Sequence, residues 1–151
     1  MLTLHAAGLL RLFDGDDRPV PGGAVAVAGD RIAAAGPYDE LAAAHPDARV
    51  RRWPGTLGPA RVHDGPLPEA PTPRERVHAL LARGVCAVPS AAVPDPADRR
   101  ACERAGVLLA GSRPPRPPVV RPSGVAHLAV FDDDGRCLAT VLNGRLVYRR
   151  A

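Results

Sequence analysis

Residues 127–150 read HLAVFDDDGRCLATVLNGRLVYRR, and this stretch has the clearest structural pattern in the sequence. Runs of apolar residues are separated by an acidic turn at 132–135 and by Asn143-Gly144. Asn-Gly between two such runs is the strongest two-residue signal for a β-hairpin, because both residues tolerate a positive φ. We therefore predict strands at 128–131, 136–142 and 145–150, with Val141 opposite Leu146 and Ala139 opposite Tyr148.

Residues 1–57 show a similar pattern of short apolar runs separated by turn-forming residues. Gly29-Asp30 lies between two of these runs and predicts a second hairpin. A short helix is expected at 38–45, ending before Pro46, because proline cannot continue a helix. The strands are rich in alanine and weak by propensity, so pairing with neighbouring strands must stabilise them.

The middle of the chain, 71–111, changes character. Thr72-Pro73 is typical of a helix start, with threonine as the N-cap and proline at the first helical position. The pattern predicts two helix–strand pairs: a helix after Thr72 with a strand at 85–88, then a helix at 96–105 with a strand at 107–110. The proline-rich segment 112–123 follows, and we expect an extended connector there because proline lacks the amide donor.

Charge and composition exclude several functional classes. The net charge is +4, and all 20 basic residues are arginine. These arginines are dispersed and aromatic residues make up only 3% of the chain, so we expect no nucleic-acid partner. The three cysteines are widely spaced and odd in number, which argues against a disulfide framework. No signal peptide or long apolar run is evident, so we predict a cytoplasmic protein without a membrane span.

Residues 55–67 read GTLGPARVHDGPL and resemble a segment of the amidohydrolase superfamily. In that family Gly-Thr-Leu-x-Pro-Gly leads into the first barrel strand, which carries a metal-binding His-x-His pair. The matching residues are Gly55, Thr56, Leu57 and Pro59, while Ala60 replaces the next glycine. The two ligand positions fall on Gly65 and Leu67, and neither side chain can donate a lone pair to a metal.

The C-terminal stretch is similar to the last strands of amidohydrolases such as imidazolonepropionases and aminodeoxyfutalosine deaminases, with His127 in the place of a consensus aspartate. The resemblance implies an α+β fold in which 1–64 and 124–151 form one composite β-sandwich. A small α/β remnant at 71–111 would be inserted between them. A complete barrel takes roughly 250 residues, so the barrel would be largely deleted.

Amidohydrolases hydrolyse C–N bonds with a metal-activated hydroxide held by the His-x-His pair, two later histidines and an aspartate. A metal lowers the pKa of its bound water only where three or more ligands converge on it. With Gly65 and Leu67 at the ligand positions, we predict no catalytic residue, no metal ligand and no cofactor. His63 and Asp64 remain as weak candidates for an acid–base pair or for metal ligands. An ordinary surface loop explains the two residues equally well.

Three further groups of residues have both a structural and a functional interpretation. Glu75 and His78 lie three apart on a predicted helix, which favours an intrahelical hydrogen bond over a metal site. The aspartates at 132–134 lack the spacing of a calcium loop and favour a hairpin turn. Cys86 follows an apolar run and is interpreted as a buried small hydrophobe rather than as a nucleophile.

The leading hypothesis is a non-catalytic amidohydrolase-like protein that acts as a binding, assembly or regulatory module. The apolar surface left by the missing barrel would be covered by the remnant, by a second copy in a homodimer or by a protein partner. The alternative is a small metal-dependent hydrolase acting on non-peptide C–N bonds, and an arginine-mediated nucleic-acid binder is the least favoured. The hydrolase would take its ligands from the cysteines and from His5, His45, His63, His78 and His127.

Overall fold

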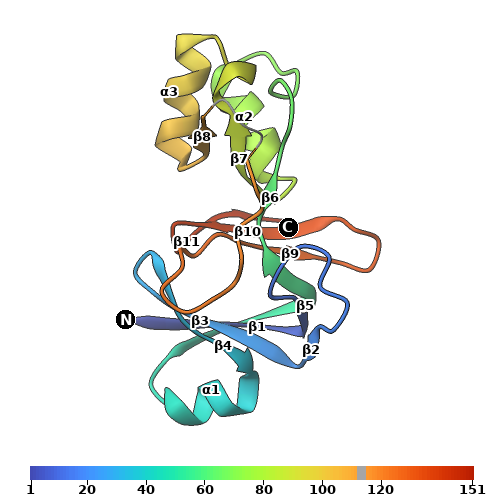
Figure 1. Ribbon diagram of the computed structural model, residues 1–151, viewed down its shortest axis with the longest axis vertical. Coiled ribbons are helices and arrows are strands. Elements are labelled where there is room, and N and C mark those ends of the chain that lie inside the picture. The colour runs from blue at the N-terminus through green and yellow to red at the C-terminus, as the bar shows by residue number, and fades with distance from the viewer. Residues whose placement is uncertain (112–114) are drawn as a thin grey trace.

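The computed structural model describes residues 1–111 and 115–151 and has a mixed α+β fold, as predicted. Its larger sheet has the order β11-β10-β9-β5-β1-β3-β4, with β2 paired to β1 (Figure 1). The strands of this sheet are β1 (Leu2–Leu10), β2 (Val20–Pro21), β3 (Gly23–Ala28), β4 (Arg31–Pro37), β5 (Arg49–Pro59), β9 (Leu128–Phe131), β10 (Cys137–Leu142) and β11 (Arg145–Arg149).

The two ends of the chain come together through β5. This strand pairs in parallel with β1 along its length and in antiparallel with β9 near its end, where Thr56 lies opposite Phe131. The two-sheet sandwich expected from the sequence is therefore not confirmed, because hydrogen bonds continue from β4 to β11 in one sheet. The reason is the length of β5, whose 11 residues give both halves of the domain a shared partner.

The sheet is folded so that its two halves pack face to face (Figure 1). A core cluster of apolar side chains fills the space between them; its largest fully buried members are Leu10, Val25, Ile32, Leu57, Leu128, Val130 and Val141. Helix α1 (Tyr38–Ala44) covers the outer face of β1 and β3 through Leu41, which packs with Leu4. The outer face of β9 to β11 packs against the middle of the chain.

Both predicted hairpins are confirmed, as β3–β4 and β10–β11. Their turns touch, because a Cβ atom on Gly144 would overlap the carbonyl oxygen of Gly29. In the second hairpin Val141 lies opposite Leu146, as predicted. The expected pairing of Ala139 with Tyr148 is wrong: a register shift after Thr140 places Thr140 opposite Tyr148.

The middle of the chain forms a separate three-stranded parallel sheet of order β6-β7-β8. Its elements are β6 (Arg61–Val62), α2 (Pro73–Leu81), β7 (Val85–Pro89), the short 3-10 helix η1 (Ser90–Ala92), α3 (Pro96–Ala105) and β8 (Leu108–Ala110). Both predicted helix–strand pairs are present, and β6 is an additional strand. Figure 1 shows this unit, which we call the insert, stacked on the β9–β11 side of the larger sheet.

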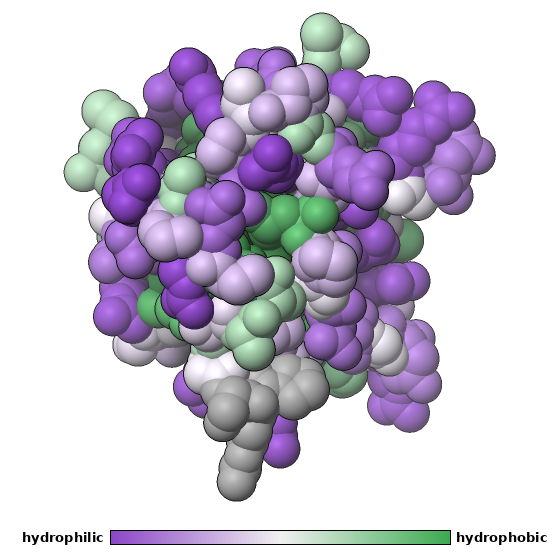
Figure 2. Space-filling view, turned by 90° about the horizontal axis from the view of Figure 1, so that it is seen from above, coloured by the Kyte–Doolittle hydropathy of each residue, from purple (hydrophilic) through white to green (hydrophobic). Residues whose placement is uncertain are grey.

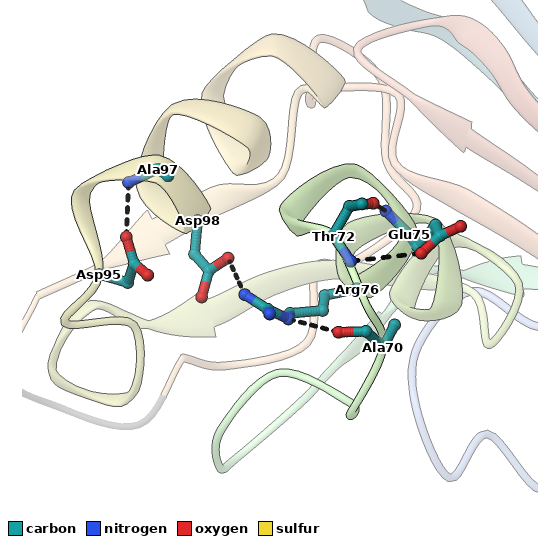
Figure 3. A network of polar contacts seen from close by, with 7 residues as sticks. All are labelled: Ala70, Thr72, Glu75, Arg76, Asp95, Ala97 and Asp98. Atoms are coloured by element: carbon teal, nitrogen blue, oxygen red, sulfur yellow. Dashed lines mark hydrogen bonds and ion pairs between the residues drawn. The ribbon is translucent and has the colours of Figure 1, made fainter.

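Polar contacts hold the insert together (Figure 3). Thr72 is the N-cap of α2, as predicted, and its hydroxyl accepts from the Glu75 amide while the Glu75 carboxylate accepts from the Thr72 amide. Arg76 joins three segments, since Nε donates to the Ala70 carbonyl and Nη1 pairs with Asp98 of α3, both at 2.9 Å. The loop before α2 is thereby tied to both helices.

The proline-rich segment connects the insert to the C-terminal strands. The part of it that is described, from residue 115, runs without helix or strand up to residue 121, and the extended connector stays a prediction. Residues 112–114, which the sequence analysis places in the same connector, lie outside the described residues. The Val120 amide donates to the Leu12 carbonyl and the Ser123 amide to the Ile32 carbonyl, so the segment returns along the first half of the domain.

Candidate functional site

The segment 55–67 leaves β5, passes through β6 and enters the loop before α2. The His63 amide donates to the Ala87 carbonyl, and its ring Nε2 bonds the Pro66 carbonyl oxygen at 2.8 Å. The His63 imidazole therefore makes its hydrogen bond to Pro66 within the same turn, and not to the exposed Asp64. Gly65 lies in the same turn, and Leu67 packs half-buried against the core of the insert.

Residues that could hold a metal do not gather in the described part of the chain. Across 1–111 and 115–151, no group of three or more histidine, cysteine, aspartate or glutamate side chains is placed to bind one ion. This includes the histidines that the hydrolase alternative would need. His5 is buried in the large sheet, and His78 is exposed on α2 with its ring edge-on to Tyr148 at 5.8 Å.

The weaker sequence candidates have structural roles. The predicted hydrogen bond between Glu75 and His78 is replaced, because Glu75 belongs to the helix cap. Asp132 accepts from the Asp134 and Arg136 amides, which confirms the hairpin turn. Cys86 is buried, and burial raises the pKa of its thiol to about 12, so it stays protonated and unreactive at neutral pH.

A cleft lies where the first part of the motif meets the turn between β9 and β10. Its volume is about 640 Å³, within the size range typical of small-molecule sites. Motif residues from Thr56 to Val62 form one wall, the loop after β1 forms the second and the 131–135 turn forms the third. Apolar lining comes from Leu9, Phe13, Pro59 and Phe131, and charged lining comes from Arg11, Arg61, Asp14, Asp132 and Asp133.

Arg61 is one of the five charged residues that line the cleft. Its guanidinium carbon lies 3.8 Å from the centroid of the Phe131 ring, a cation–π contact that holds the side chain over the lining. Both charges and aromatic surface are thus presented to a bound molecule, which suits a small polar ligand with a flat apolar part. This cleft has no local signal in the sequence, because Arg61 and Phe131 are far apart in the chain.

Comparisons with known proteins agree with this architecture. A family model described as the imidazolonepropionase-like composite domain of bacteria matches residues 23–48. No match to the chain was found among curated protein sequences. The match agrees with the resemblance stated from the sequence, and it shows that residues 23–48 are similar to an imidazolonepropionase-like composite domain.

Solved structures of amidohydrolase-superfamily enzymes share the fold. An E. coli guanine deaminase matches with a TM-score of 0.56 and 15% identity over 74% of this chain and 36% of the enzyme. Helicobacter pylori aminofutalosine deaminase in complex with methylthio-coformycin matches with a TM-score of 0.55 and 14% identity, over 72% of this chain and 34% of the enzyme. A triazine hydrolase variant matches with a TM-score of 0.53 and 14% identity, over 73% of this chain and 35% of the enzyme. The chain thus spans about a third of the length of these enzymes.

Helix length bears on the membrane prediction. In the described residues, no helix is both long and apolar enough to cross a membrane.

Proposed function

We propose that the chain is a non-catalytic amidohydrolase-like module that binds a small polar ligand in the cleft beside Arg61. The observation that carries the proposal is the difference between the two halves of the segment 55–67. Of its matching residues, Thr56 and Pro59 line the cleft, while Gly65 and Leu67 stand at the two ligand positions of the resemblance. The nearby His63 ring is held by Pro66. Binding without hydrolysis is the activity that these residues support best.

The surface left by the missing barrel bears on partners. The loop at 63–72 covers the insert, because Leu67 packs into its core and Arg76 holds the Ala70 carbonyl. Seen from above, this end of the molecule is largely hydrophilic, with a small hydrophobic area near its centre (Figure 2). A protein partner or second copy would instead contact the cleft, where Leu9 and Phe13 are 36% and 46% exposed. A cytoplasmic location stays a prediction.

Metal content and hydrolysis test the non-catalytic part of the proposal. We expect the purified protein to contain well below one equivalent of zinc, iron or manganese by mass spectrometry. We also expect no release of ammonia from guanine and no hydrolysis of a triazine, the compounds named for the structural neighbours. A stoichiometric metal, lost on chelation together with such an activity, would replace this proposal with the metal-dependent hydrolase acting on C–N bonds.

Ligand-observed NMR with the same two compounds tests the cleft. Arg61→Gln removes the charge that lies over Phe131 and should abolish any saturation transfer, whereas Arg100→Gln should leave it unchanged. Arg100 is an exposed residue of α3 outside the cleft lining. Equal binding by both variants would place the ligand elsewhere and contradict the cleft assignment.

A further inference from the structure

Three arginines converge at one end of the core of the larger sheet. Arg49 and Arg51 alternate along β5, so both side chains leave the same face of the strand. Arg51 lies opposite His5 of β1. Arg149 approaches from β11, and its guanidinium carbon is 5.4 Å from the centroid of the Trp53 ring. The cluster thus joins strands from both ends of the chain.

The floor of this cluster is a buried aromatic pair. His5 and Trp53 are 3% and 9% exposed, and their rings are nearly parallel with an interplanar angle of 8°. The Trp53 indole Nε1 donates to His5 Nδ1 at 3.2 Å, which requires that nitrogen to be unprotonated. Burial, and secondarily Arg51, lower the pKa of His5 to about 4. At neutral pH His5 is therefore uncharged, and the positive charge of the cluster comes from the arginines alone.

Among the residues that the structure describes, none of the three arginines of the cluster forms an ion pair with an acidic side chain. In the described residues the ion pairs are Arg76–Asp98 and Arg31–Asp30, and neither involves the cluster. The pKa of Arg51 is lowered by burial and by the neighbouring charges of Arg49 and Arg149. Like charges held together without a counter-ion repel one another, so a bound anion would stabilise the arrangement. Guanidinium groups are the side chains best suited to bidentate contact with phosphate oxygens.

We propose that Arg49, Arg51 and Arg149 form a binding site for the phosphate group of a small phosphorylated molecule. The site lies between β5 and β11, above the His5–Trp53 pair, and shares no lining residue with the cleft of the proposed function. A small ligand fits better than nucleic acid. The cluster is confined to three arginines, and among the described residues its aromatic contacts are the buried His5–Trp53 stack and the contact of Arg149 with Trp53, which offer no row of exposed rings for bases.

Inorganic phosphate and pyrophosphate are the probes, titrated at constant ionic strength against sodium chloride. Trp53 is the single tryptophan of the chain, so its emission reports on the site directly. We expect the emission to change and saturate at low millimolar phosphate, and to saturate at a lower concentration of pyrophosphate. Chloride should cause no change in emission. A linear response, or the same response to chloride, would show screening of surface charge and overturn the proposal.

Variants locate the site. Arg51→Gln and Arg149→Gln should each weaken pyrophosphate binding at least tenfold, and Arg51→Lys should weaken it less because it keeps the charge and loses the fork. Arg100→Gln on α3 removes one charge elsewhere and should bind like the parent chain. Since Arg51→Gln also removes repulsion, its melting temperature without ligand should equal or exceed that of the parent. Unchanged binding in both cluster variants would refute the assignment.

Double-stranded DNA of mixed sequence provides the last comparison. We expect no saturable retention of DNA at physiological salt under conditions where pyrophosphate binds. If DNA binds through Arg51 and Arg149 while pyrophosphate does not, the site is a nucleic-acid contact and the small-ligand proposal is wrong.

Discussion

Gly55 and Gly65, two of the three glycines of the segment 55–67, have different surroundings. Gly55 has a φ of +86°, and a Cβ atom there would overlap the carbonyl oxygen of Phe131 on β9. Gly65 has a φ of +148°, and the nearest atom to an added Cβ is His63 Nε2 at 3.9 Å. The first glycine stands where two strands approach closely, whereas the second lies in a loop with free space around it.

This difference separates what the fold needs from what a reaction needs. The residues that still match the amidohydrolase pattern lie on β5, where they join the two ends of the chain. The positions that carry metal ligands in that pattern lie beyond the sheet, in a turn that folds around a His63–Pro66 hydrogen bond. We therefore expect the fold to constrain Gly55 more strongly than Gly65.

The largest expected effect comes from placing a methyl group at each glycine. Gly55→Ala combines backbone strain with a clash against β9 and should lower the free energy of unfolding by about 4 kcal/mol or more. Gly65→Ala meets strain alone and should cost about 1–2 kcal/mol. Urea unfolding followed by circular dichroism measures both. Equal losses would show that the two halves of the motif are under the same constraint.

The composite domain and the insert should also respond differently to acid. The folded-state pKa of His5 is about 4 against 6.5 for the free side chain, so the unfolded chain takes up a proton there first as pH falls. Stability is fully present above pH 6.5 and declines toward pH 4, by up to about 3 kcal/mol. Burial also lowers the pKa of His127, which contributes with the same sign.

Urea unfolding at several pH values between 7.5 and 4.5 checks this, with Trp53 emission reporting on the composite domain. His5→Gln should reduce the dependence on pH while lowering stability at pH 7.5, because the bond from Trp53 is weakened. A slope that is the same with and without His5 would assign the acid response to other groups. The insert core instead contains Cys86 and Cys102, whose pKa values are raised by burial, so these thiols add nothing in this range.

A smaller effect is expected in the insert at Arg76. Arg76→Gln removes the ion pair with Asp98, whose side chain is only 13% exposed, and the bond to the Ala70 carbonyl. The cost should be about 1–2 kcal/mol. Hydrogen exchange should show lost protection in α2 and α3 and unchanged protection in β1, β3 and β5. Loss of protection in those strands as well would mean that the insert and the composite domain unfold as one unit.

The smallest effect is expected at the helix cap. Thr72→Ala removes the hydroxyl that accepts from the Glu75 amide and should cost about 1 kcal/mol. Thr72→Ser keeps the acceptor and should stay within a few tenths of a kcal/mol of the parent. Thermal unfolding of the three proteins side by side provides the measurement. An alanine variant as stable as the serine variant would show that the cap adds nothing in this context.

Much of the local structure was predictable from the sequence. The Gly29-Asp30 and Asn143-Gly144 turns and the Thr72 cap depend on residues within a few positions of one another, and all three are present. The pairing of Ala139 was predicted wrongly, because a bulge after Thr140 shifts the register and nothing in the local pattern marks it. The continuation of β5 past Trp53 also has no local signal, since Pro54 and Gly55 are typical of the end of a strand.

By itself the sequence determined the turns, the caps and the identity of Gly65 and Leu67, because these depend on single side chains and on contacts between near neighbours. Only the tertiary structure decided that β5 joins β9, that Arg61 lies over Phe131 and that Arg149 lies over Trp53. These contacts join distant segments. They form where apolar faces are buried together, and local sequence patterns carry no record of which faces will meet.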